Sequence, residues 1–305
     1  MNVADDDDPL SRQRSMVELE PSPVEDTPRE QKSDYFAPPT STSNNTTFLG
    51  LSLSRSPSWY LIKAQKYSSY AFTAFLSMHM TNTSLIPLIT QSVPASEPYL
   101  LLTRPYYQSP LAEPLVVAAP LLVHVASGVA LRLYRRREDL KMYGAEDRGD
   151  RRKIAWPKVS GTSKLGYAMT GLLAGHVFIN RVVPLLVHGG SSTVNLSYVS
   201  HAFAKHPAVS FFGFAALIGV GVAHMTWGMS KWLGLAPTQV VVWGGEGRLE
   251  KKRRWWAVNG VAAVVAGLWM AGGLGVVGRG GEVKGWVGRE YEELYRSIPI
   301  VGRWM

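Results

Sequence analysis

Four histidines have a spacing that could bind a metal-containing cofactor. His79, His124, His176 and His224 each lie in a different long apolar segment of the chain. An ionisable side chain is costly at membrane depth, so such residues usually face the interior of a helix bundle. Two imidazoles that face each other from different helices can ligate the iron of a b-type haem when they lie at matching depth. We therefore predict that these four histidines are candidate haem ligands.

The same histidines have a simpler interpretation as structural groups that hydrogen-bond across helices. Gly171 and Gly175 lie beside His176, where they would either admit the edge of a porphyrin or let two helices pack closely. Arg181 would pair with a haem propionate or a lipid phosphate, or else extend to the membrane surface while its stem stays in hydrocarbon. The remaining histidines fall at a helix end or in a loop and are expected to be solvated: His188, His201 and His206.

Composition excludes several other kinds of site. The chain has 305 residues, no cysteine and a formal net charge of +9. Without cysteine it cannot hold a disulfide, a thiolate-ligated zinc ion, an iron–sulfur cluster or covalently attached c-type haem. Lys and Arg cluster beside apolar runs rather than in a recognition motif, so we expect no nucleic-acid partner. The chain has no hydrolase, kinase or metalloprotease motif and no inverted repeat, so we expect neither an enzyme nor a transporter.

Five apolar segments are long enough to form helices that cross a membrane. They cover 59–89, 114–134, 165–187, 208–235 and 255–277, and the first is the least hydrophobic because Ser, Thr and His interrupt it. A helix needs about 20 apolar residues to cross roughly 30 Å of hydrocarbon. The sequence therefore predicts an all-α, polytopic membrane bundle of about five transmembrane helices over residues 59–278.

The positions of the basic residues predict how this bundle is oriented. Lys and Arg are dense in 135–164 and 231–254, whereas the other two loops contain only Arg104 and Lys205. Such residues concentrate on the cytosolic side, so we place both basic loops and the N-terminal tail in the cytosol. The basic loops would also attract anionic lipids. The segment 279–305 is too polar to span and is expected either to lie in the membrane interface or to pack on the end of the bundle.

Residues 1–58 are predicted to form a disordered cytosolic tail. The segment is rich in Pro, Ser, Thr and Asp and offers too little apolar surface to offset the entropy lost on ordering. Four consecutive aspartates near its start are unlike an Arg-rich cleavable presequence, so we expect the transmembrane helices to direct insertion. The stretch LEPSPV has a form suited to docking as an extended peptide, with two prolines flanked by apolar side chains: Leu19, Pro21, Pro23 and Val24.

Five spans with histidines on the first four resemble the cytochrome b membrane anchor of succinate dehydrogenase and fumarate reductase. The resemblance implies that His79 faces His176 and that His124 faces His224, each pair holding one haem b. The catalytic flavoprotein and iron–sulfur subunits of those complexes are separate chains. This chain departs from a respiratory anchor in its long basic loop and its acidic N-terminal sequence.

A fungal family within that superfamily is more similar. The similarity is carried by SSYAFTAFLSMHMTN at 68–82, GYAMTGLLAGHVFINRVVPLL at 166–186 and VGVAHMTWGMSKWLG at 220–234, and it covers 59 to about 278. Its members are mitochondrial outer-membrane adaptors, described as complementing the loss of an ER–mitochondria tether component. The resemblance implies a multi-pass protein of the mitochondrial outer membrane, with the ER membrane as the alternative.

Members of that family act in lipid homeostasis at organelle contact sites. They recruit a bridge-like, chorein-type lipid-transfer protein through a Pro-x-Pro motif in the cytosolic tail. The resemblance assigns this role to LEPSPV and predicts a non-enzymatic adaptor. The alternative is a b-type cytochrome with bis-histidine haem, which transfers electrons.

Overall fold

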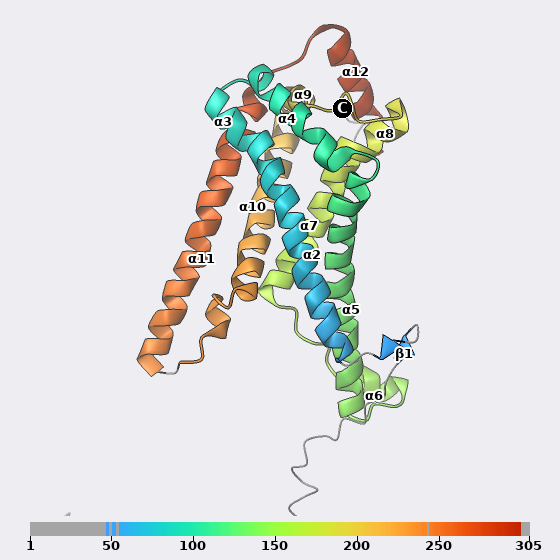
Figure 1. Ribbon diagram of the computed structural model, residues 1–305, viewed down its shortest axis with the longest axis vertical. Helices are drawn as coiled ribbons and strands as arrows, with labels where there is room; N and C mark the ends of the chain where they lie inside the picture. Colours follow the sequence, from blue (N-terminus) through green and yellow to red (C-terminus); the bar gives the residue numbers. More distant parts are fainter. Residues whose placement is uncertain (1–46, 49–50, 53–54, 243, 300–305) are drawn as a thin grey trace, which may run out of the picture. The chain divides into compact units, whose positions relative to one another are not determined.

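The computed structural model describes residues 47–48, 51–52, 55–242 and 244–299 (Figure 1). The chain divides into two units, Met1–Ser54 and Arg55–Met305. In the first unit, strands β1 (Thr47–Phe48) and β2 (Leu51–Ser52) pair antiparallel inside the segment predicted to be disordered. The stretch LEPSPV lies outside the described residues, so its predicted role stays a prediction.

In the second unit, the described residues form helices joined by turns. The long helical segments are α2 (Pro57–Met80) with η2 (Thr81–Leu85) and α3 (Ile86–Thr90), η3 (Glu113–Ala118) with α5 (Ala119–Met142), α7 (Gly161–Val177) with η4 (Phe178–Val182) and α8 (Val183–His188), α10 (Pro207–Trp232), and α11 (Gly244–Gly273). Shorter elements join them: α4 (Val93–Gln108), α6 (Arg148–Lys153), α9 (Leu196–Lys205), η5 (Pro237–Gln239), η6 (Val277–Arg279) and α12 (Gly285–Arg296).

Local chemistry explains where several of these helices begin and end. The side chain of Ser160 accepts a hydrogen bond from the backbone N–H of Ser163 and starts α7, and Asn195 caps α9 in the same way. Proline at the first helical position starts α2 and α10, where its missing N–H would have had no partner in the helix. Gly189 ends α8 with a φ of 69°, a left-handed conformation that glycine adopts at little cost.

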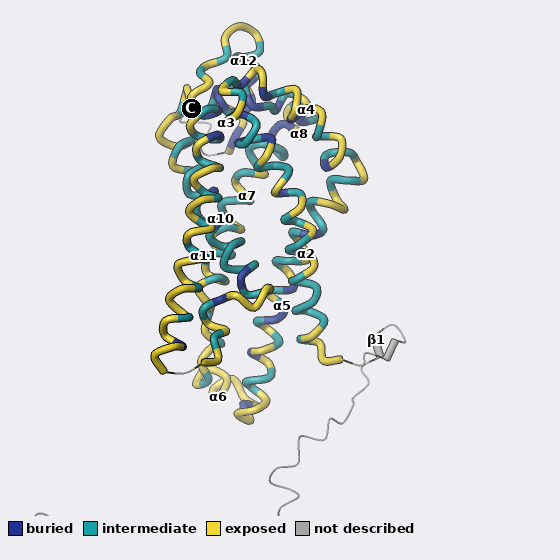
Figure 2. Tube along the Cα trace, turned by 60° about the vertical axis from the view of Figure 1, so that its left-hand side comes forward, coloured by how far each residue is buried: buried dark blue, intermediate teal, exposed yellow. Residues whose placement is uncertain are grey.

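Four helical segments are long and apolar enough to cross a membrane: Glu113–Met142, Gly161–His188, Pro207–Gln239 and Gly244–Arg279. They correspond to the second to fifth predicted spans and confirm an all-helical membrane protein. Only 11–17% of the residues in their most apolar windows are buried (Figure 2). Because so much apolar surface faces outward, these helices are suited to contact with hydrocarbon.

The first predicted span, 59–89, is also helical but does not reach the apolar content of the other four. It runs through α2, η2 and α3 and carries a row of hydroxyl groups. Thr73, Ser77 and Thr81 each donate to the carbonyl four residues earlier, at 2.7–2.9 Å. These bonds satisfy the hydroxyls within the helix, so the segment can lie beside α5 without further polar partners.

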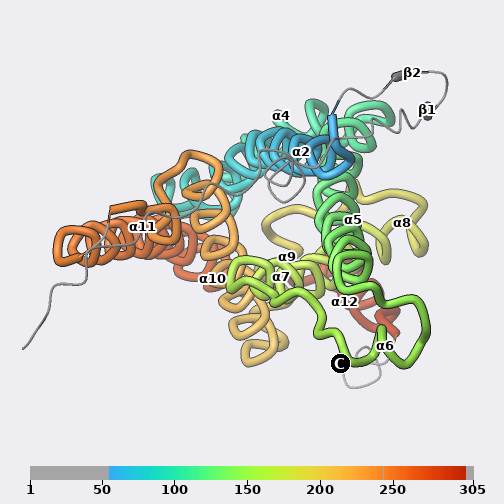
Figure 3. The backbone as a smooth tube through the Cα atoms, turned by 90° about the horizontal axis from the view of Figure 1, so that it is seen from below, coloured from blue at the N-terminus to red at the C-terminus, as the bar shows by residue number. Residues whose placement is uncertain are grey.

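The long helices form two pairs and one outer helix (Figures 1 and 3). Helix α2 packs along α5, α7 packs along α10, and α11 lies against α10. The start of α2, the short helix α6 and the turn between α10 and α11 lie at one end of the unit, which we call the basic end. Helices α3, α4, α8, α9 and α12 lie at the other end, which we call the cap. Both basic loops therefore lie at the same end as the start of α2, as predicted from the charge pattern.

The cap contains the best-buried apolar cluster of the described chain, contributed by α8, α9 and α12: Val183, Val194, Tyr198, Tyr291, Leu294, Tyr295 and Ile298. Tyr198 and Tyr295 stack with their ring centres 4.6 Å apart, and the Tyr295 hydroxyl donates to the Tyr198 carbonyl at 2.7 Å. Burial raises the pKa of Tyr198 to about 12. Helix α12 thus packs on the end of the bundle, the second of the two arrangements expected for 279–305.

The two helix pairs are related by an internal repeat. The pattern Tyr-Ala-x-Thr-x-x-Leu-x-x-His occurs at 70–79 in α2 and again at 167–176 in α7. In both copies a π-helical turn begins two residues after the histidine, as η2 in one half and η4 in the other. Helices α5 and α10 share His-x-x-x-Gly, at 124–128 and 224–228. Because α2 and α7 both run from the basic end to the cap, the two halves form a parallel repeat rather than an inverted one.

Candidate functional site: two facing histidine pairs

One histidine pair joins the second helices of the two halves. His124 of α5 and His224 of α10 have ring centres 6.1 Å apart and ring planes at 79°. The Nδ1 atom of His124 lies 3.1 Å from the carbonyl oxygen of Gln65, and that of His224 lies 3.0 Å from the carbonyl oxygen of Thr162. A carbonyl can only accept, so each Nδ1 carries the proton and donates it. Each Nε2 is therefore left with its lone pair free for a further ligand. We call this the anchored pair.

The two carbonyl anchors occupy equivalent positions in the repeat. Gln65 and Thr162 each lie fourteen residues before the histidine of the repeated pattern in their own half. The sequence predicts neither anchor, because every residue type has a main-chain carbonyl and the side chain does not show which carbonyl accepts a hydrogen bond. The repeat itself was the available signal, since it aligns Gln65 with Thr162 and His124 with His224.

Glycine at position 166 lets His224 approach α7. A Cβ atom built on Gly166 would lie 2.8 Å from Cε1 and 3.2 Å from Nδ1 of His224. Real Cβ atoms essentially never lie within 3.0 Å of such an atom, so a larger residue would push the ring away from the Thr162 carbonyl. The His224 ring can lie here because residue 166 is a glycine and has no side chain.

The second pair joins the first helices of the two halves. His79 of α2 and His176 of α7 also have ring centres 6.1 Å apart, with ring planes at 75°. Phe75 stacks on His79 at 5.7 Å, Phe214 meets His176 edge-on at 5.7 Å, and Trp269 lies 6.5 Å from His79. Among the described residues, neither imidazole hydrogen-bonds to a main-chain carbonyl. We call this the aromatic pair.

The donor set at the anchored pair fits a bis-histidine haem. Two imidazoles bound to one iron from opposite faces, each with a metal–nitrogen distance of about 2 Å, have ring centres about 6 Å apart. Second-shell carbonyls on Nδ1 are the usual way in which proteins orient a metal-binding imidazole. Among the described residues, no group of three or more His, Cys, Asp or Glu could hold a metal ion by itself. A haem differs from a free metal ion because its iron is already bound by the porphyrin, so the protein would have to supply only the two imidazoles.

The glycines beside His176 border open space. A Cβ atom built on Gly171 or Gly175 would meet no atom within 4 Å. Close helix packing, one of the two roles considered for this pair of glycines, is therefore not what the structure shows. The open space is compatible with the edge of a bound group or with a lipid chain.

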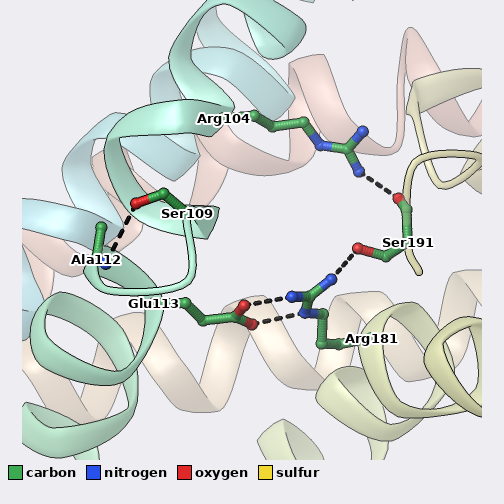
Figure 4. A network of polar contacts seen from close by, with 6 residues as sticks. All are labelled: Arg104, Ser109, Ala112, Glu113, Arg181 and Ser191. Carbon is green, nitrogen blue, oxygen red and sulfur yellow. Dashed lines mark hydrogen bonds and ion pairs between the residues drawn. The ribbon is translucent and has the colours of Figure 1, made fainter. Parts of the chain in front are cut away.

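Arg181 lies in a polar network below the cap (Figure 4). Its guanidinium forms a bidentate ion pair with Glu113, with Nε 2.6 Å from Oε1, and it also donates to the Ser191 hydroxyl. Arg104 donates to the carbonyl oxygens of Ser191 at 2.8 Å and Ser192 at 3.3 Å. The network ties η3 of the first half to η4 of the second. Sequence reasoning missed Glu113, and the propionate or phosphate role of Arg181 stays a prediction.

The structure corrects the expectation that His201 is solvated. This residue of α9 is fully buried in the cap, where its Nδ1 accepts the backbone N–H of Val283 at 3.2 Å. Its ring lies between Tyr291, at 5.7 Å, and Tyr295, at 6.4 Å. The burial has no local signal in the sequence, because the helix that covers α9 is α12, which lies far from it along the chain. A buried histidine with aromatic neighbours is a packing element of the cap.

The first basic loop is folded at one point and exposed elsewhere. Arg136 is buried and donates to the carbonyl oxygens of Ala155 at 2.9 Å and Arg151 at 2.5 Å, with its guanidinium 5.1 Å from the centre of the Trp156 ring. Its other arginines and lysines are exposed, as contact with anionic lipids would require: Arg135, Arg137, Lys141, Arg148, Arg151, Arg152, Lys153, Lys158 and Lys164.

Comparison with known proteins gives one family match. Residues 171–282 match the model of a family described as the transmembrane domain of MDM10-complementing protein 1. The matched part includes His176, Arg181 and His224 and extends from α7 to the end of η6. No curated protein and no solved structure matches the chain.

Proposed function

We propose that the chain is a multi-pass adaptor of the mitochondrial outer membrane that acts in lipid homeostasis at organelle contact sites. In this role its N-terminal tail recruits a chorein-type lipid-transfer protein through LEPSPV. The observation that carries the proposal is the similarity of residues 171–282 to the transmembrane domain of MDM10-complementing protein 1. The anchoring role requires no catalytic group in the bundle.

The arrangement of the basic end supports a cytosolic tail. Helix α2 starts at the same end as α6 and as the turn between α10 and α11, where the exposed arginines and lysines gather. Positively charged loops stay on the cytosolic side during insertion, so the chain that precedes α2 would emerge into the cytosol. A tail in that compartment can reach a cytosolic lipid-transfer protein.

The test uses the full-length protein in mitochondria. Replacing Pro21 and Pro23 by alanine should weaken recruitment of the tagged lipid-transfer protein about tenfold or more, because the prolines limit the entropy lost on docking. The matched control replaces Pro38 and Pro39, two prolines of the same tail outside the motif. Unchanged recruitment by the Pro21 and Pro23 variant, at equal membrane insertion, would contradict the proposal.

The anchored pair favours a second candidate function, a b-type haem protein. A haem bound there would provide one-electron transfer, while the chain would supply the two Nε2 ligands and hold them by their Nδ1 anchors. Protein purified from haem-replete cells should show a Soret band that His124→Ala removes. His206→Ala is the control, because that imidazole belongs to neither pair. A colourless wild-type preparation would exclude this candidate and leave the adaptor proposal standing.

A further inference from the structure

Two lysines lie at the basic-end side of the anchored pair. Lys66 directly follows Gln65, whose carbonyl accepts from His124. Its ammonium donates to the carbonyl oxygen of Trp232 at 3.3 Å and lies 5.7 Å from the centre of the Tyr70 ring. Since Tyr70 belongs to α2 and Trp232 to α10, Lys66 bridges the two halves of the repeat beside the pair.

Lys231 approaches the same place from the other half. It follows His224 by seven residues, which is two helical turns, so both side chains lie on one face of α10. It is half-buried, so its stem stays against the helices while it lies toward the basic end from His224. The two lysines therefore lie on the basic-end side of the anchored pair, one from each half.

Neither lysine has a carboxylate partner among the described residues. Every ion pair found there involves a different cation, such as Arg181 with Glu113 or Arg254 with Glu250. A half-buried ammonium beside an apolar span loses hydration and usually finds an anion or extends fully into water. Within the described chain, Lys66 neither pairs with an anion nor extends into water. Its ammonium points toward α10 and donates one of its three N–H groups to the main-chain carbonyl of Trp232.

We propose that Lys66 and Lys231 bind the two propionate carboxylates of the haem that the anchored pair would hold. The inference rests on the second candidate function and assigns the groups that would fix which edge of the macrocycle faces the basic end. Two cations match a dianion, and each half of the repeat contributes one lysine as it contributes one imidazole. A single buried arginine would pair both oxygens of one carboxylate, whereas two separate ammonium groups suit two separate carboxylates.

The test titrates the haem-free full-length protein in neutral-lipid nanodiscs with haem and, separately, with haem dimethyl ester, and follows the Soret band. Wild-type protein should bind haem about tenfold or more tightly than the ester, since each charge-assisted bond contributes at least that much. The variant with Lys66→Gln and Lys231→Gln should lose this preference while its affinity for the ester stays unchanged. Lys66→Arg with Lys231→Arg should keep the preference.

Lys63→Gln is the matched control, because Lys63 lies one turn earlier on α2, with its ammonium 5.5 Å from the centre of the Trp59 ring and 5.8 Å from that of Tyr67. It should bind both ligands like wild type. If the Lys66 and Lys231 variant keeps the full preference for haem over its ester, the lysine assignment is wrong and the haem candidate stands. If wild type binds neither ligand, the haem candidate and the lysine assignment both fall, and the adaptor proposal stands.

Discussion

The anchored pair and the aromatic pair have the same ring separation but are held by different forces. At the anchored pair, two main-chain carbonyls fix the Nδ1 protons of His124 and His224. At the aromatic pair, the rings of His79 and His176 pack among phenylalanine and tryptophan side chains. The one polar side-chain contact found there among the described residues is long, 3.4 Å between the Asn180 amide and the His176 Nδ1. A hydrogen bond fixes the tautomer and the direction of a lone pair, whereas aromatic packing fixes only the position of a ring.

The difference shows that a repeated sequence need not repeat a function. Both pairs lie across the same interface between halves, and both follow from one duplicated pattern of residues. In the part of the chain that the structure describes, only at the anchored pair do carbonyl acceptors on Nδ1 orient the Nε2 atoms of both imidazoles. Only this pair also has two lysines, Lys66 and Lys231, on its basic-end side. We therefore locate the candidate haem site at His124 and His224 and interpret His79 and His176 as packing residues, which departs from the expectation of two equivalent haem sites.

The strongest way to break the comparison is to fill the space at Gly166. Gly166→Leu should displace the His224 ring and lower the free energy of unfolding by about 3 kcal/mol, at the upper end of overpacking costs. Gly171→Leu, on the same helix, should have little effect because no atom lies near its Cβ position. Thermal unfolding in detergent measures both variants. Equal losses of unfolding free energy in the two variants would show that the anchored pair is packed no more closely than the region around Gly171.

A smaller effect is expected at the ion pair between Arg181 and Glu113 below the cap. Arg181 and Glu113 are each 28% exposed, so breaking their contact should cost less than a fully buried pair, about 2 kcal/mol. Arg181→Gln and Glu113→Gln should each lower the unfolding midpoint, and the double variant should lose much less than the two losses added together. Additive losses would mean that the two side chains do not stabilise each other.

Sequence patterns predicted the helices well because hydrophobicity is a local signal. The second to fifth spans, the shared end of the two basic loops and the pairing of four histidines by helix order all have counterparts in the structure. The first span differs from the other four in its lower apolar content, and it carries hydroxyls that bond within the helix at Thr73, Ser77 and Thr81 and to α11 at Ser84. Except for the bond from Ser84, each of these features depends on residues close together in the chain or on the order of helices.

Contacts between distant residues could not be read in the same way. Glu113 begins the π-helical turn η3 and Arg181 lies in η4, 68 residues later in the chain, yet the two meet in one network below the cap (Figure 4). The burial of His201 depends on α12, which follows it by about eighty residues in sequence. The carbonyl anchors were also missed, although the repeated pattern before His79 and His176 would have aligned them. Long-range packing, not local propensity, decides these positions.

The smallest expected effect compares the two pairs directly by the same substitution. His224→Phe removes the hydrogen bond to Thr162 and should lower the free energy of unfolding by about 1 kcal/mol, the usual net value of one such bond. His176→Phe keeps a flat ring between Phe214 and His79 and loses only the long contact, 3.4 Å, between the Asn180 amide and the imidazole Nδ1. Its stability should therefore change by less than about 0.5 kcal/mol. Unfolding of both variants in the same detergent, without haem, measures the difference. If His176→Phe is the more costly change, the Asn180 contact holds the aromatic pair as firmly as the carbonyl anchors hold the other pair, and the two pairs are alike after all.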